Sequence, residues 1–445
     1  MDLSIKKLEE QLDSFDLSQR RDALCQLWSK VTAGEIELAL CGDWVNLHCH
    51  TFFSYNAYGY SPSKFAWLAK KAGLAVAGIV DFDVLDGLEE FYWACQQIDL
   101  KAIVGIESRV YVSEFADKVI SSPGEPGVSY HMGVGFVDAN ITGSAGDFKA
   151  SLGKTSEQRN RALIAKVNEY LQPVELDYER DVVCLTPGGN ATERHICLAY
   201  ARKAMGVFAD AEELKDFWRD KLGKEIGDGG LPESTTLQGL IRAKTMKRGG
   251  VGYVQPGAGS FPSLEDMNKF ILAAGAIPTH TWLNGLSDGE KQIEDLLEIG
   301  MQSGIAAINI IPDRNYTSGA KDEKLANLHQ VVEIAERLGL IIVCGTEMNS
   351  GGQKFVDDFD SSELKPLLPI FLKGAYITYG HSVLQRQSGF GYTSQWTKKN
   401  FNSVTLKNEF FEKLGRVIEP STEKILSELT EDSNPHEILK RIENE

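Results

Sequence analysis

The chain has 445 residues, of which 42% are hydrophobic and 24% charged, as expected of a folded protein with one large domain and an insertion, or two to three domains. Its 46 Lys and Arg against 63 Asp and Glu give a net charge of -17, which argues against long nucleic acid as a partner. Seven scattered cysteines, no amino-terminal apolar leader and no long apolar run predict a cytoplasmic protein without a membrane partner.

Strand-like and helix-like segments alternate along most of the chain. Alternation of this kind favours a parallel α/β architecture, and seven or eight units favour a closed or nearly closed barrel. We expect helices at residues 61–72, 85–97, 263–274, 287–303 and 321–338. We expect strands at residues 44–50, 76–83, 101–112, 131–137, 276–281, 305–311, 340–347 and 375–380.

Two regions at the ends and one in the middle depart from this alternation. The middle region has three helical stretches and closes with a Gly-rich charged loop at residues 223–230, so we expect it to form an insertion over the barrel mouth. The predicted segments are a helical arm at 1–38, the first barrel part at 39–140, the helical insertion at 141–246, the second barrel part at 247–399 and a helical tail at 400–445.

His48 and His50 occupy alternate positions of the first strand, so both imidazoles should point to the same side. Two imidazoles at one strand end make half a metal site, although a pair of hydrogen-bonded core histidines is the alternative. The remaining evidence is positional, because other possible ligands also fall at or near strand ends, where barrel chemistry is located. These residues are Asp81, Asp83, Glu107, His280 and Glu347.

The ordered motifs of the chain resemble those of the PHP (polymerase and histidinol phosphatase) superfamily. The segments are His48-Cys-His-Thr-Phe-Phe-Ser54, Val80-Asp-Phe-Asp83, Gly105-Ile-Glu107, His131-Met-Gly, Pro278-Thr-His280 and Gly345-Thr-Glu-Met-Asn349. They are similar to HxHTxxS, TDHD, GxE, a strand-opening His, AHP and GSDxH. The resemblance implies a distorted (β/α)7 barrel, and the branch with a helical insertion is the most similar.

The resemblance implies two divalent ions, of Zn, Mn or Fe. The first would be held by His48, His50, Glu107 and Glu347, and the second by Glu107, His131 and His280. Two ions a few ångströms apart can activate a shared water and clamp the oxygens of a phosphate. Catalysis would then rest on Glu107, Arg194 and His195. Arg194 and His195 belong to Glu193-Arg-His-Ile196, which resembles the R-x-H-[IF]-A segment that helps to hold the substrate phosphate in the family.

The chain also departs from the family motifs. Phe82 replaces the His of TDHD, Glu347 the Asp of GSDxH, and Asn349 its His, which predicts that a third metal site is absent or rebuilt. His381 is a candidate to enter the cavity as a replacement ligand, although a core or loop histidine is an equal alternative. Asp81 and Asp83 are expected to orient the ligand imidazoles.

The predicted function is metal-dependent hydrolysis of a phosphate ester of a small metabolite or nucleotide by activated water. A small phosphorylated substrate is therefore the expected partner. Two alternatives stay open at this point: a dinuclear hydrolase of an amide or lactone, and a metal-binding scaffold that has lost catalysis. The sequence does not indicate an oligomeric state.

Overall fold

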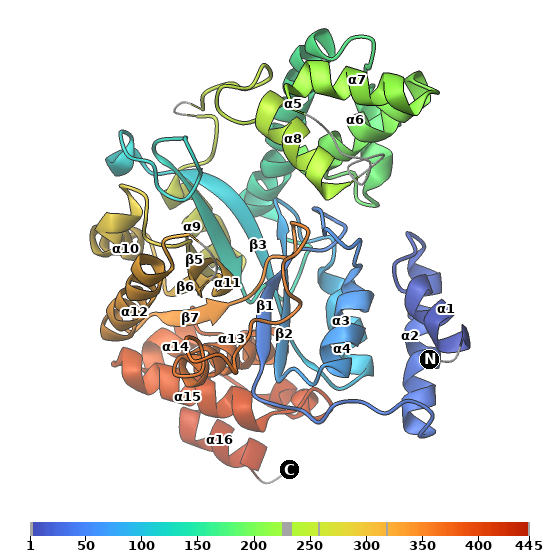
Figure 1. The fold of residues 1–445 in the computed structure, drawn as a ribbon. Helices are drawn as coiled ribbons and strands as arrows, with labels where there is room; N and C mark the ends of the chain where they lie inside the picture. The colour runs from blue at the N-terminus through green and yellow to red at the C-terminus, as the bar shows by residue number, and fades with distance from the viewer. Residues whose placement is uncertain (1–2, 225–233, 257–258, 317–318, 444–445) are drawn as a thin grey trace.

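The computed structural model describes residues 3–224, 234–256, 259–316 and 319–443. One sheet of seven strands, in the order β1-β2-β3-β4-β5-β6-β7, forms its centre (Figure 1). All residues of these strands are buried except Phe82, Arg109, Tyr111 and Tyr130, which are half-buried, as in barrels covered by helices. The strands are β1 Val45–Cys49, β2 Val76–Phe82, β3 Lys101–Tyr111, β4 Val128–Val134, β5 Ile277–Trp282, β6 Ala307–Ile310 and β7 Ile341–Cys344.

The direction of β4 differs from the parallel arrangement expected. β4 runs antiparallel to both β3 and β5, whereas the other neighbouring strands are parallel. The β3–β4 connection, residues 112–127, contains only the 3-10 turn η1, Ser113–Phe115. A parallel pair usually needs a crossover helix, so a connection without one returns the chain in the opposite direction.

The barrel is nearly closed by the segment that follows β7. The His50 amide donates a hydrogen bond of 2.8 Å to the Glu347 carbonyl, and the Glu347 amide donates one of 2.7 Å to the His48 carbonyl. These bonds form a parallel bridge between Cys49 and Glu347. The α/β barrel predicted from the sequence is therefore confirmed, with seven strands.

The eighth predicted strand, residues 375–380, was wrong. It lies inside helix α13, Leu368–Ser388, which contacts β7, β1, β2 and β3. Most of the central turns of α13 are buried, so its sequence lacks the polar face that marks a surface helix. A short apolar run of this kind cannot be distinguished from a buried strand by periodicity.

The remaining helices surround the barrel (Figure 1). α9 packs against β3, β4 and β5, and α12 against β7. An amino-terminal pair, α1 Leu3–Gln11 and α2 Leu17–Thr32, packs beside α3 and α4. The outer helices are α3 Pro62–Lys71, α4 Leu88–Gln97, α9 Leu264–Ala273, η5 Glu290–Gln292, α10 Ile293–Gln302, α11 Asp313–Tyr316 and α12 Lys321–Leu338; the carboxyl-terminal ones are α14 Gln395–Asn400, α15 Val404–Val417, η6 Glu423–Glu428 and α16 Pro435–Glu443.

A group of helices between β4 and β5 lies over the end of the barrel at which β1 ends (Figure 1). These helices have their own hydrophobic cluster, which includes Trp218 and Tyr200. Asn190 donates a hydrogen bond of 2.6 Å to the carbonyl of Phe82, at the end of β2. Most of the expected Gly-rich loop at 223–230 lies outside the described residues. The elements are α5 Gly143–Tyr170, η2 Tyr178–Val182, η3 Val183–Leu185, α6 Glu193–Val207, α7 Ala211–Leu222 and α8 Thr235–Thr245.

Among the described helices, none combines the length and the apolar character needed to cross a bilayer.

Candidate metal centre

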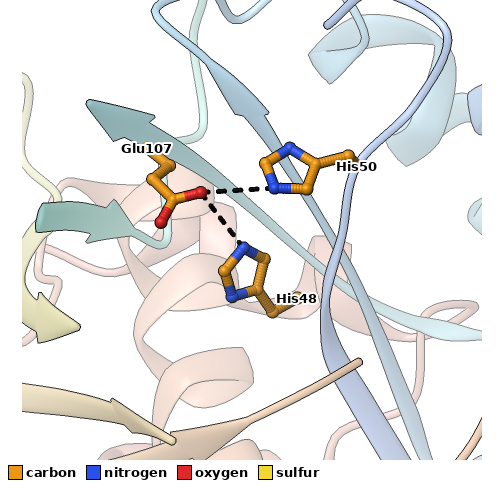
Figure 2. Close-up of side chains that lie close together, drawn as sticks. All are labelled: His48, His50 and Glu107. Carbon is orange, nitrogen blue, oxygen red and sulfur yellow. Dashed lines mark ion pairs between the residues drawn. The ribbon is translucent and has the colours of Figure 1, made fainter. Parts of the chain in front are cut away.

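Three side chains from β1 and β3 converge inside the barrel: His48, His50 and Glu107 (Figure 2). The Nε2 atoms of His48 and His50 lie 3.5 Å and 3.2 Å from Glu107 Oε2. The two imidazoles are 0% exposed and the carboxylate 1%. All three contacting atoms lack a regular hydrogen-bond partner. Buried polar atoms without partners are costly, and a divalent cation would compensate all of them together, so the group fits a metal.

The tautomer of His50 follows from its neighbours. Its Nδ1 lies 3.2 Å from Ser54 Oγ, and that hydroxyl donates its own proton to Asp81 Oδ1 at 2.6 Å. Ser54 can therefore only accept from His50, which places the imidazole proton on Nδ1 and leaves the Nε2 lone pair facing Glu107. Asp81, which also accepts from Thr51, thus orients His50 through Ser54 rather than by direct contact.

The carboxylate and the imidazoles shift one another's ionisation. Burial alone would raise the pKa of Glu107, but the close imidazoles of His48 and His50 outweigh burial and lower it to about 2. Burial alone would lower the pKa of His48, yet Glu107 raises it. The group therefore keeps an ionised carboxylate that attracts positive charge, from either a proton or a metal ion.

Glu347 lies beside this group but is engaged elsewhere. Its Oε2 accepts a hydrogen bond of 2.6 Å from Arg314 and one of 3.0 Å from Gln353. Its backbone has a φ of 61°, and Met348 follows with 55°, a left-handed conformation that costs free energy and is often found at functional sites. The predicted ligand role of Glu347 would require its carboxylate to be shared with Arg314.

The structure does not bring His131 and His280 to the group. On the antiparallel β3–β4 pair, Glu107 is opposite Met132, and His131 is opposite Ser108. Neighbours along a strand point to opposite faces, so Glu107 and His131 lie on opposite faces of the sheet. His280 is the register partner of His131 and shares its face. The second ion predicted on Glu107, His131 and His280 therefore has no matching arrangement in the described part of the chain.

The contacts of His131 also place it on the outer face of the sheet, where α9 packs. His131 Nε2 lies 2.6 Å from Asn268 Oδ1 on α9. Asn268 uses its amide nitrogen to donate to Ser303, so its oxygen accepts from the imidazole. Burial lowers the pKa of His131 to about 4 and that of His280 to about 3, the behaviour of buried neutral imidazoles.

His381 also lies away from the group, which corrects its suggested role as a replacement ligand. It belongs to α13, and both of its ring nitrogens are used by the backbone. Nε2 lies 3.1 Å from the Gly135 carbonyl, and Nδ1 accepts from the Tyr392 amide at 2.9 Å. No lone pair of this imidazole is left for a metal.

The two residues that end the second motif, Phe82 and Asp83, have different surroundings. The Phe82 ring stacks on the His50 imidazole, with centroids 4.4 Å apart, and so covers one side of the group with carbon. Asp83 points away from it and accepts from Ser108 Oγ at 2.6 Å, beside a separate cavity lined by Arg159 and Phe261. The predicted role of Asp83 in orienting a ligand imidazole is therefore not supported by a contact.

Arg194 borders a cavity of about 400 Å³ between the helical group and the barrel. The cavity also has Arg242, Lys247, Tyr55 and Asn349 on its walls. His195 is buried next to it, and its Nδ1 accepts from the Thr192 amide at 3.1 Å, which caps α6. Burial lowers the pKa of His195 to about 3. The structure thus places Arg194 on an open wall and uses His195 in the local fold.

Sequence reasoning missed three residues that border these sites. Arg242 and Lys247 come from α8 and the turn after it, where cations are ordinary on a helix surface. Asn309 lies on β6, inside the barrel, and influences His48. Its position was detectable, because it is the single polar residue in the apolar run 305–311.

The fold and the site together define an α/β barrel with a buried His–His–carboxylate group that could hold a metal ion. Residues 46–226 match the sequence profile of the PHP domain, which confirms the resemblance drawn from the motifs and supports a metal-dependent hydrolase. The match covers less than half of the chain and ends before His280 and Glu347. No curated protein matches the chain.

Solved structures with similar folds include two bacterial proteins. An amidohydrolase from Chromobacterium violaceum, with bound sulfate and no metal, is 19% identical at a TM-score of 0.48, over 69% of this chain and 88% of that one. A protein designated a metal-dependent phosphoesterase from Bifidobacterium adolescentis is 17% identical at a TM-score of 0.46, over 75% and 98%.

Proposed function

We propose that the protein is a metal-dependent phosphoesterase that hydrolyses a small phosphorylated metabolite or nucleotide. The PHP domain match and the His48–His50–Glu107 group support metal-dependent hydrolysis. The observation that carries the phosphate part is the cationic cavity at Arg194. The same arrangement supports one divalent ion on the inner group, of Mn, Fe or Zn, in place of the two expected.

His48, His50 and Glu107 would hold the ion through two imidazole nitrogens and one carboxylate oxygen. When bound, a divalent ion there lowers the pKa of a water and stabilises negative charge on a phosphate oxygen. The chain itself fixes the donors before the ion arrives: Ser54 sets the His50 tautomer, and the low pKa of Glu107 keeps the carboxylate ionised. Phe82 shields one side of the site from water.

The cavity at Arg194 favours an anion. Arg242 and Lys247 share one carboxylate, Glu193, at 2.9 Å each, while Arg194 has a polar contact of 3.4 Å with Ser350. Burial would raise the pKa of Glu193, but Lys247, Arg242 and Arg109 hold it at about 2, so it stays charged. Arg194, Arg242 and Lys247 on the cavity wall outnumber the single carboxylate of Glu193, so the cavity has an excess of positive charge. The guanidinium of Arg194 matches the geometry of a phosphate.

The cavity lies close to the His48–His50–Glu107 group, because two residues of its wall are next or nearly next in sequence to residues that contact His50. Tyr55, on the cavity wall, follows Ser54, which contacts His50. Asn349, also on the wall, lies two residues after Glu347, whose carbonyl accepts from the His50 amide. A phosphate held near Arg194 and a scissile bond near the ion therefore suit one small substrate.

The test is a screen of phosphorylated metabolites and nucleotides with Mn²⁺ or Zn²⁺ supplied, with released phosphate as the readout. On the best substrate, Arg194→Ala should lose about 2 to 4 kcal/mol of transition-state stabilisation, because a charge-assisted contact to a developing anion is removed. Bound metal and the unfolding temperature should not change. Arg180→Ala, an exposed arginine of the same helical group, is the matched control and should keep full activity.

An Arg194→Ala enzyme with wild-type turnover would remove the phosphate role from this residue. Release of phosphate from none of the compounds, together with turnover of an amide or lactone, would replace the proposed function with the carbonyl alternative.

A further inference from the structure

We infer that Asn309, on β6, is a further ligand of the ion held by His48, His50 and Glu107. The inference rests on the proposed metal function and adds an amide oxygen from a strand in the opposite half of the barrel.

Asn309 faces the interior next to His48. It is 0% exposed, and its side chain contacts the His48 imidazole. Its register partner on β5 is Thr281, which therefore shares its face of the sheet. The outward face of the same strands instead carries His280 and Ile308, which are also register partners.

The hydrogen-bonding state of Asn309 is unusual. Neither its amide oxygen nor its amide nitrogen has a regular hydrogen-bond partner, and the Thr281 hydroxyl also lacks one. Two other fully buried asparagines of the barrel are satisfied: Asn46 donates to Thr346 Oγ1 and the Phe355 carbonyl, and Asn268 bonds His131 and Ser303. Buried side-chain amides are nearly always paired, and the only protein group that this one reaches is His48, outside regular hydrogen-bond geometry, so it can take a further partner.

A cation is the partner that accounts for the most orphaned atoms. The unpartnered atoms of Asn309 belong to the same interior as those of His48, His50 and Glu107. An amide oxygen is a neutral, hard donor of a lone pair. Adding such an oxygen to two imidazoles and a carboxylate moves the preference away from soft, low-coordinate sites towards Mn²⁺ or Fe²⁺.

The experiment is a Mn²⁺ titration of the metal-stripped full-length chain, measured by calorimetry and by the EPR signal of free Mn²⁺. Asn309→Leu should weaken Mn²⁺ binding at least tenfold without changing the number of sites. Asn309→Asp, which restores a ligand oxygen with charge, should bind at least as tightly as wild type. Asn268→Leu, a buried asparagine of the outer face, is the matched control and should keep wild-type affinity.

Thermal unfolding gives a second readout that is independent of activity. Metal-free Asn309→Leu should melt at a temperature equal to or above that of the metal-free wild type, because a buried unpaired amide has been removed. On addition of Mn²⁺, its melting temperature should rise less than that of wild type. This combination distinguishes a ligand from a residue that only supports the fold, whose loss would lower stability in both states.

His50→Asn should lose the ion. If it does, wild-type Mn²⁺ affinity in Asn309→Leu would overturn the inference, and so would a loss of binding in Asn309→Asp. Unchanged binding in His50→Asn as well would show instead that the proposed metal centre is wrong. An increased KM with unchanged metal affinity would assign Asn309 to substrate and also overturn its role as a ligand.

Discussion

The inner and outer faces of the barrel each carry a pair of buried histidines, in opposite chemical states. Inside, His48 and His50 face the Glu107 carboxylate, which raises the pKa of His48. Outside, His131 bonds Asn268 of α9 and its register partner His280 shares its face, and burial lowers their pKa values to about 4 and 3. A histidine in a family motif can thus be either a ligand or a packing residue.

The difference follows from strand register. Glu107 and His131 are on neighbouring strands, and a shift of one residue in their pairing would place both on the same face. The observed pairing puts Met132 opposite Glu107 and leaves the inner face beside it apolar. One residue of register therefore decides whether Glu107 and His131 face the same side of the sheet.

The largest effect should come from removing ligands on the two faces separately. Glu107→Gln or His50→Asn should lose nearly all bound metal and all hydrolysis, a larger loss than the roughly 10- to 100-fold typical of a residue that only orients a ligand. His131→Gln and His280→Gln should keep their metal, because both side chains lie on the face of the sheet opposite Glu107. Elemental analysis of each purified variant measures this contrast. If His131→Gln and His280→Gln lost as much metal as the inner variants, the outer histidines would be ligands too, and the predicted second ion on Glu107, His131 and His280 would be supported.

The outer face should control stability in acid. The unfolded imidazoles of His131 and His280 titrate near 6.5, the folded ones near 4 and 3, so between these values the unfolded state binds more protons. The free energy of unfolding should therefore fall as the pH falls from about 6.5 towards 4, by on the order of 3 kcal/mol for His131 alone. In the metal-free protein His48 acts oppositely, because its raised pKa stabilises the fold below about 6.5 and this contribution is lost as the pH rises.

Urea unfolding at a series of pH values measures this effect. His131→Gln keeps a donor for Asn268 but cannot titrate, so its stability should depend less steeply on pH than that of wild type. A slope identical to wild type would mean that His131 is not the buried neutral imidazole described above.

Much of the barrel was predictable from sequence, because buried parallel strands are apolar runs separated by helical periods. The position of His48 and His50 at a strand end also followed from alternation alone. The direction of β4 was not predictable, since a strand pattern is the same in both directions. Its register and the helical state of α13 were also hidden, because both depend on tertiary contacts that local patterns do not encode.

The smallest effect should come from the hydroxyl that orients one inner ligand. Ser54 accepts from His50 Nδ1 and donates to Asp81, so Ser54→Ala frees the imidazole to adopt the other tautomer. We expect metal binding about 10- to 100-fold weaker, with stability little changed because Asp81 keeps two bonds from Thr51. Ser108→Ala removes the corresponding bond to Asp83 on the outer face and should leave affinity unchanged. Calorimetric titration with Mn²⁺ compares the two variants. Equal affinities in Ser54→Ala, Ser108→Ala and wild type would show that the inner histidines do not depend on their hydrogen-bond partners for metal binding.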